Sequence, residues 1–83
     1  MANIQRPYAG AADAATVTPT DDVELDPIPR ALWVGTAGNL TVILKNMSTT
    51  IAFNNIQAGT MIELEAKEVR ATGTTASDIV AVW

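Results

Sequence analysis

The sequence predicts an all-β fold: a small antiparallel β-sandwich or barrel of five to six short strands with an extended N-terminal arm. From residue 30 onward, short runs of apolar and β-branched residues are separated by turn residues, chiefly Gly, Asn, Thr and Ser, which is the pattern of all-β domains. All four prolines fall within residues 1–29, where they disfavour regular ladder pairing. At 83 residues, the chain has the length of one domain.

The chain divides by charge and composition at residue 29. Residues 1–29 carry five acidic side chains and one arginine, whereas residues 30–83 carry four charges of each sign. We therefore predict an extended, Pro-rich acidic arm at residues 1–29 and a neutral β-sandwich or barrel body at residues 30–83. Within the arm, residues 16–18 (TVT) are the one strand-like patch, and we expect Val23 and Leu25 to contact the body.

The body contains six candidate strands, at residues 31–34, 40–44, 49–53, 60–66, 66–71 and 78–83. Alternation of side chains places Leu40, Val42 and Leu44 together on one face of their strand, and it places Ile51 and Phe53 on the expected core face of the next. The segment 66–71 has some helical propensity, but six residues between two strands are too few to sustain a helix. We therefore interpret it as a strand.

Composition indicates that the chain needs partners to complete its packing. Hydrophobic residues make up 48% and charged residues 17% of the sequence, and there is no cysteine or histidine. A domain of this size has a thin core and usually adds disulfides, a metal or other subunits. Disulfides and a zinc site are excluded by the missing residue types, so we expect subunit contacts.

The sequence argues against membrane and nucleic-acid functions. No apolar run approaches the roughly 20 residues of a transmembrane helix, and the first residues lack the apolar core of a signal peptide. A neutral body without a basic cluster lacks the cations that offset several phosphates. We expect a soluble product made in the host cytoplasm, with no membrane and no nucleic acid among its partners.

Four segments in order resemble a known family. Residues 30–39 (RALWVGTAGN) and 69–83 (VRATGTTASDIVAVW) together resemble the head spike base proteins of gene transfer agents and related tailed phages. Residues 15–21 (ATVTPTD) look like the entry segment of that family, and residues 55–59 (NIQAG) look like its central turn. The resemblance covers residues 15–83.

The resemblance implies a virion structural protein on the capsid exterior, acting as a head spike base or vertex decoration. Its expected partners are further copies of itself in a cyclic homo-oligomer, a pentamer in this family, the major capsid protein, and a spike or fibre protein. One departure concerns the strand at residues 60–66, where Glu63 and Glu65 stand in place of the proline and basic residues common in the family. The outward surface there is expected to meet a different partner.

Catalysis, metals and cofactors are not expected. Without histidine or cysteine, the usual general base and thiol nucleophile are missing, and no base is suggested for Ser48 or Ser77. Glu63 and Glu65 lie on one strand face, whereas glycoside hydrolysis needs carboxylates across a cleft. The acidic cluster of the arm does not have the spacing of an EF-hand loop. We predict that the protein is not an enzyme.

The candidate interface residues are aromatic, apolar or acidic side chains: Trp33, Met61, Glu63, Val82, Trp83, Asp21 and Asp22. Aromatic residues are enriched at the centres of interfaces, so we expect the two tryptophans to pack in the core or against a neighbouring subunit. The two aspartates are expected either to be solvated or to reach a basic patch on a capsid subunit. As an alternative, exposed tryptophans would suit an adhesin-like module that binds host surface glycan directly.

Overall fold

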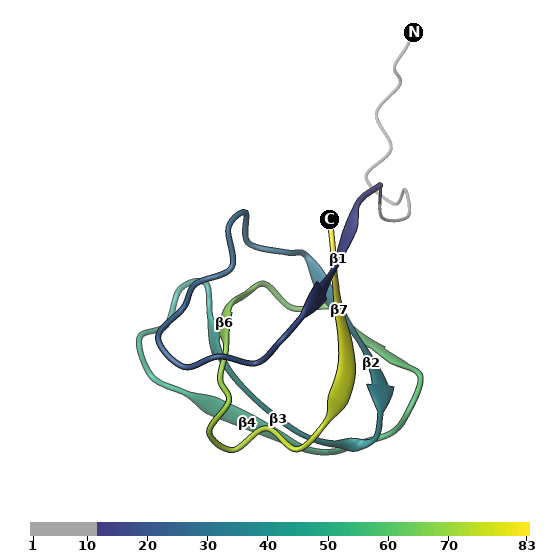
Figure 1. Ribbon diagram of the computed structural model, residues 1–83. Coiled ribbons are helices and arrows are strands. Elements are labelled where there is room, and N and C mark those ends of the chain that lie inside the picture. Colours follow the sequence, from purple (N-terminus) through teal and green to yellow (C-terminus); the bar gives the residue numbers. More distant parts are fainter. Residues whose placement is uncertain (1–11) are drawn as a thin grey trace, which may run out of the picture.

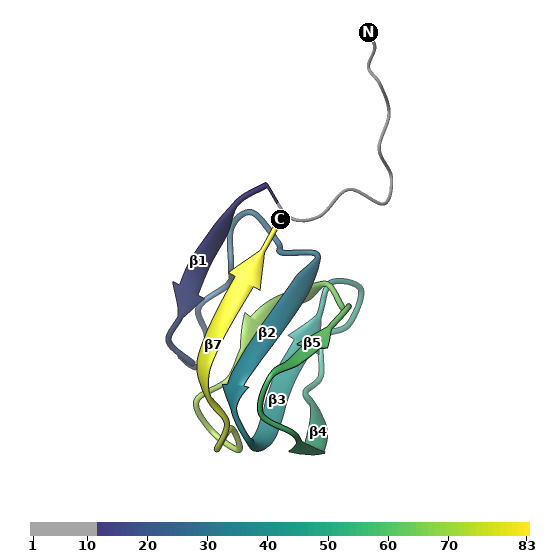
Figure 2. The same ribbon diagram turned by 90° about the vertical axis from the view of Figure 1, so that its right-hand side faces the viewer.

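The computed structural model describes residues 12–83 as seven antiparallel strands in two packed sheets (Figure 1). A four-stranded sheet has the order β1-β7-β2-β5, as Figure 2 shows from left to right, and a three-stranded sheet has the order β4-β3-β6. The strands are β1 (Ala14–Val17), β2 (Ala31–Thr36), β3 (Gly38–Leu44), β4 (Ile51–Ile56), β5 (Thr60–Ile62), β6 (Ala66–Val69) and β7 (Ser77–Val82). The predicted all-β sandwich is confirmed, with seven strands instead of five to six.

The additional strand is β1, which comes from the segment predicted as an arm. β1 pairs with the last strand, β7, in a register that runs from Ala14 opposite Val82 to Val17 opposite Ile79. The strand-like patch at residues 16–18 overlaps the end of this strand. The described part of the arm is thus hydrogen-bonded into the four-stranded sheet, while the division of the chain at residue 29 stays a prediction.

After β1 the chain crosses to the other sheet. The backbone N–H of Thr20 donates to the carbonyl of Val69 at 2.9 Å, and that of Leu25 donates to the carbonyl of Lys67 at 2.8 Å. Residues 18–25, here called the strap, therefore run beside β6 and close one side of the sandwich (Figure 1). Leu25 packs against the core as expected, whereas Val23 is 53% exposed.

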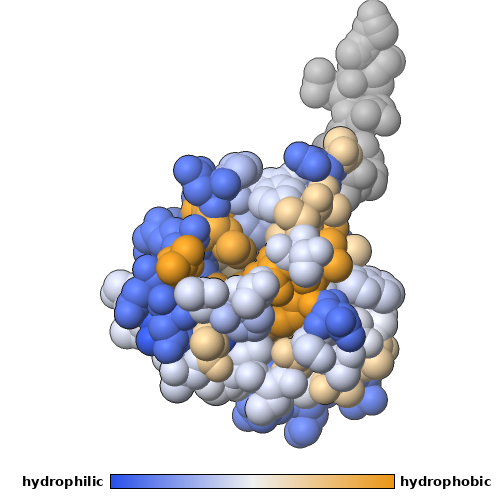
Figure 3. Space-filling model, viewed as in Figure 1, coloured by the Kyte–Doolittle hydropathy of each residue, from blue (hydrophilic) through white to orange (hydrophobic). Residues whose placement is uncertain are grey.

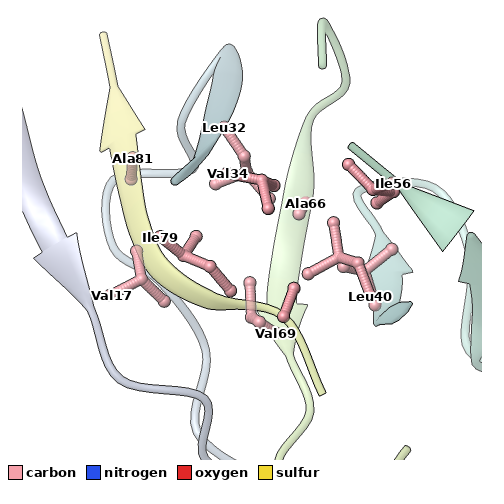
Figure 4. Packing of buried hydrophobic residues seen from close by; sticks show 11 residues of the cluster. Val17, Leu32, Val34, Leu40, Ile56, Ala66, Val69, Ile79 and Ala81 are labelled. Carbon is pink, nitrogen blue, oxygen red and sulfur yellow. The ribbon is translucent and has the colours of Figure 1, made fainter. Parts of the chain in front are cut away.

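The core lies between the two sheets, where buried side chains from facing strands point toward one another (Figure 4). Leu40 and Val42, which share one face of β3, are fully buried, and Phe53 packs against this cluster as expected. Ile51 is 38% exposed because it begins the edge strand β4. Ile56, which we expected in a turn, is buried. The cluster consists of Val17, Leu32, Val34, Leu40, Val42, Ile56, Ala66, Val69, Ala76, Ile79 and Ala81.

The strand predicted at residues 60–66 is shorter in the structure for a topological reason. β5 ends at Ile62 because residues 63–65 leave the four-stranded sheet and lead to β6 in the other one. There the N–H of Lys45 donates to the carbonyl of Glu65 at 2.8 Å. The single alternating run at residues 60–66 thus spans both layers.

The two long sides of the sandwich differ. The strap side is formed by β1 and the strap, and the open side, opposite to it, is formed by the edge strands β4 and β5. Figure 3 shows the strap side, where apolar residues reach the surface in the middle and hydrophilic residues lie around them. Among residues 12–83, no helix is long and apolar enough to cross a membrane. The same residues hold no group of three acidic, His or Cys side chains arranged for a metal ion.

Two glycines fix the turns where the chain changes sheet. Gly73 has a φ of 90° in the turn between β6 and β7, a conformation that glycine adopts without steric penalty. Gly38 begins β3 directly after the bend at Ala37, and a Cβ there would lie 2.5 Å from the backbone nitrogen of Ala76. The close approach of these two backbones requires glycine.

We expect Gly38→Ala to destabilise the fold by about 1–3 kcal/mol, because the added methyl group forces the backbone at Ala76 to move. The midpoint of thermal unfolding by circular dichroism measures this loss. Ala37→Ser, at the exposed neighbouring position, is the control and should leave the midpoint nearly unchanged. An unaltered midpoint in Gly38→Ala would contradict the close packing.

Candidate functional site

One face of the four-stranded sheet carries apolar side chains that do not belong to the core. Leu32 and Val34 of β2 point inward and are fully buried, so Trp33 between them points outward. The register places Trp33 opposite Met61 on β5 and Val80 on β7. We call the outward residues Ala31, Trp33, Met61, Val80 and Val82 the apolar face.

The apolar face is partly open to solvent. Trp33 is 39% exposed and Met61 is 48% exposed, and both rank among the large exposed hydrophobic residues of the described chain. None of the five residues is charged. An exposed Trp–Met pair on the outer face of a sheet has the composition of an interface centre.

The structure brings together three of the predicted interface residues and separates the others. Trp33, Met61 and Val82 share the apolar face, although Val82 is buried. Glu63 is exposed at the end of the sandwich, beyond β5. Their role in an interface stays a prediction.

Trp83 packs against the core of its own chain. Its indole Nε1–H donates to the carbonyl of Pro27 at 3.0 Å. Its backbone N–H donates to the carbonyl of Asp13 at 2.9 Å, and its carbonyl accepts from Ala12 at 2.8 Å. The predicted alternatives for this residue were its own core and a neighbouring subunit, and these contacts are intramolecular.

Asp21 fastens the strap to the turn after β6. Its Oδ1 accepts hydrogen bonds from the backbone N–H groups of Ala71 at 2.9 Å and Thr72 at 3.1 Å, and its Oδ2 accepts from Thr72 Oγ1 at 2.6 Å. The Arg70 Nε lies 3.3 Å from Oδ1. The hydrogen bonds and the ion pair of the Asp21 carboxylate are therefore made within the chain.

Arg70 joins the strap to β6. Its Nη1 lies 2.6 Å from Oε1 of Glu68 and 3.2 Å from Oδ1 of Asp22. Glu68 is only 6% exposed, and its Oε1 also accepts from the backbone N–H of Asp22 at 3.1 Å. The Asp22 side chain itself is 89% exposed. Together with Asp21, these residues form the strap cluster.

The hydrogen bonds of the strap cluster shift its ionisation equilibria. The bonds from the Thr72 hydroxyl and backbone lower the pKa of Asp21 below its ordinary value, and the bond from Arg70 lowers the pKa of Glu68. The bond to Glu68 raises the pKa of Arg70. Each shift favours the charged form that makes the contact.

A shallow pocket of about 390 Å³ lies at the end of the sandwich, next to the C-terminus of β3. It is lined by apolar Leu44, Met47 and Leu64 and by charged Arg30, Glu63 and Glu65, among others. The adjacent ion pair between Lys45 and Glu65 spans 3.9 Å with both side chains more than half exposed, so it contributes little to stability. Mixed charge at this pocket gives no preference for an ionic ligand.

Sequence reasoning missed Val80, Arg70 and Glu68. The alternation within residues 78–83 assigns Val80 to the face opposite Ile79, but only the pairing of β7 with β2 reveals that it adjoins Trp33. Arg70 looked like one of several scattered cations. Its partners in the strap lie 48 and 49 positions away, beyond the reach of any local pattern.

Comparison with known proteins relates the chain to a component of a capsid. No protein-family model matches the chain, and neither does any curated protein sequence. Among solved structures, the chain is similar to a chain in the capsid of a native GTA (gene transfer agent) particle computed with C5 symmetry, with 32% sequence identity and a TM-score of 0.81. The match covers 90% of this chain and 86% of the other.

The strap cluster predicts a loss of stability in acid. Because the folded-state pKa values of Asp21 and Glu68 are lowered, their contribution is present above the unfolded-state values of about 4 and is lost as the pH falls below them. The double variant Asp21→Asn, Glu68→Gln should lower the unfolding midpoint at pH 7 and flatten its dependence between about pH 5 and 2.

Urea unfolding across this pH range measures the effect. The control is Glu24→Gln, an exposed carboxylate of the same strap, which should change neither the midpoint nor the slope. A double variant whose acid dependence equals that of the unmodified chain would contradict the structural role of the cluster.

Proposed function

We propose that this protein is a virion structural protein on the capsid exterior. The chain belongs to the same family as the matched chain in the capsid of the native GTA (gene transfer agent) particle. The more specific role we propose is a head spike base or vertex decoration. It would form a cyclic homo-oligomer that contacts the major capsid protein on one surface and supports a spike or fibre protein on another. We propose no enzymatic activity.

The similarity at 32% identity over 90% of the chain carries this proposal. Relatives this similar conserve their fold, and the C5 symmetry of the matched capsid structure is compatible with a ring of five copies around one axis. The order of segments that resembles head spike base proteins spans the same β-sandwich. Both lines of support concern particle assembly.

The apolar face is our candidate for the surface that contacts the capsid. Trp33 and Met61 stand side by side on neighbouring strands, and both are substantially exposed. Burying two large uncharged side chains against a protein surface is favourable. The strap cluster is unsuitable for this purpose because its carboxylates already have partners within the chain.

The partial exposure of Trp33 favours a second candidate function, that of an adhesin-like module that binds host glycan. Aromatic rings bind sugars by stacking when one ring face is open. Gly59 favours this, because a Cβ there would lie only 3.7 Å from Cη2 of Trp33, so the glycine leaves that edge of the indole uncovered. Quenching of tryptophan fluorescence by host oligosaccharides, abolished in Trp33→Phe, would support this function.

We expect the double variant Trp33→Ser, Met61→Ser to bind the particle at least about 30-fold more weakly, the factor for losing about 2 kcal/mol at an interface centre. The measurement adds purified chain to particles assembled without it and quantifies the bound copies. Because both side chains point away from the core, the unfolding midpoint should change little.

The matched control is Thr49→Ser together with Ser48→Thr, at exposed positions in the loop before β4, which should bind normally. Normal particle binding by the Trp33 and Met61 variant would exclude the apolar face as the capsid contact. If that variant instead loses its oligomeric state in solution, the apolar face belongs to the contact between subunits.

A further inference from the structure

The open side of the sandwich has little protection against strand pairing at the start of β4. Residues 46–62, which include both β4 and β5, contain no charged residue and no proline. β4 pairs regularly with β3 at residues 51–53 and is irregular beyond them, where Asn55 has a φ of 62°. Natural edge strands are usually blocked by charge, proline, a bulge or a covering segment, so the regular stretch around the exposed Ala52 indicates a pairing partner.

The hydrogen bonds of β3 show which backbone groups of β4 point outward. The N–H and C=O of Thr41 point toward the β6 side, because the N–H donates to Thr74 Oγ1 and the carbonyl accepts from Arg70. Thr41 is paired with Ala52 of β4. In an antiparallel ladder, this makes them a pair without mutual hydrogen bonds. The N–H and C=O of Ala52 therefore point away from the sheet, into the open edge.

The same reasoning applies to β1 on the strap side. The carbonyl of Val82 accepts from the N–H of Arg30 at 3.0 Å, so Val82 directs its backbone groups toward β2. Its partner on β1, Ala14, and the equivalent residue Thr16 opposite Val80 consequently direct theirs outward. β1 is thus an edge strand with free backbone groups at Thr16, and its four residues carry no charge.

These are the two long open edges among residues 12–83, and they lie on opposite sides of the molecule. The edge at β6 is covered by the strap, and β5 has only three residues. β1 belongs to the four-stranded sheet and β4 to the three-stranded sheet. An interaction between them joins two different surfaces of identical chains, which is the head-to-tail arrangement that closes into a ring.

Charge distribution favours this pairing over contact between two strap sides. The acidic residues Asp21, Asp22 and Glu24 lie on the strap side, whereas residues 46–62 on the open side carry no charge. Two strap sides in contact would oppose carboxylates of chains that each have a net charge of −4. A strap side that meets an open side avoids this repulsion.

We propose that β4 of one copy pairs with β1 of the next copy, so that the three-stranded sheet of one subunit continues into the four-stranded sheet of its neighbour. This inference rests on the cyclic assembly in the proposed function and specifies its contact. Backbone pairing across the junction gives the affinity, as in strand addition generally. The apolar face stays free for the capsid.

Proline substitutions test the two edges separately. Ala52→Pro and Thr16→Pro each remove an outward N–H and leave the ladder inside the subunit intact, which is the position where edge strands tolerate proline. The full-length chain and both variants are compared by light scattering after size exclusion. We expect the unmodified chain to be a ring and each variant to have the 8.7 kDa mass of a single chain, with an unchanged β-sheet spectrum.

Mixing the two variants gives the decisive result. The Ala52→Pro variant retains an intact β1, and the Thr16→Pro variant retains an intact β4. An equimolar mixture should therefore form a one-to-one dimer and nothing larger. If Thr16→Pro alone still assembles while Ala52→Pro does not, β4 pairs with something other than β1, which overturns the proposal.

Controls distinguish pairing from side-chain and folding effects. Ala52→Thr and Thr16→Val keep the N–H groups and should assemble normally. If the proline variants fail to fold, hydrogen exchange of the backbone amides in the unmodified oligomer tests the proposal instead. Protection of the Ala52 and Thr16 amides supports the pairing, and rapid exchange of these amides overturns it. An unmodified chain that is monomeric both free and on particles overturns the edge pairing while leaving the capsid role intact.

Discussion

Pairing of the N-terminal segment with both sheets is the constraint on which the rest of the structure depends. β1 adds to β7 in one sheet, and the strap adds to β6 in the other. A chain without cysteine and with a thin core has few other means of closing a sandwich. The strap cluster fixes the crossing, since Arg70 contacts both sheet and strap. Deleting residues 12–25 would therefore remove one strand of the four-stranded sheet and the segment that covers β6.

Local pattern was sufficient for most of the fold. Alternation located the strands of the body and grouped Leu40 and Val42 on one strand face, and turn residues such as Gly73 marked the changes of direction. It could not find the strand pairing of β1, because a short run of Ala, Thr and Val has no feature that specifies a partner more than 60 residues away. The strap cluster was missed for the same reason, because an ion pair between Arg70 and Asp21 produces no repeating pattern in the sequence. Of the candidate site, the sequence named Trp33 and Met61 as candidate interface residues, but the outward direction of Trp33 and its position next to Met61 required the strand register.

The strap covers only one side of the sandwich, so the two sides of the molecule differ. The strap covers the β6 edge and concentrates acidic residues there, while the opposite side keeps an unprotected edge at β4 and the uncharged segment 46–62. A symmetric closure would have left two equivalent sides, and identical copies would then have had no means of distinguishing head from tail. In the proposed role, this asymmetry allows one small subunit to present distinct surfaces to its neighbours and to the capsid.

The position of β7 between β1 and β2 also governs when the fold becomes available. The four-stranded sheet has no contact between β1 and β2 except through β7, so it stays incomplete until residues 77–82 have left the ribosome. At synthesis rates of about 5–20 residues per second, that is several seconds after β2 has been made. A nascent chain that has not yet reached residues 77–82 therefore lacks the strand with which β1 pairs.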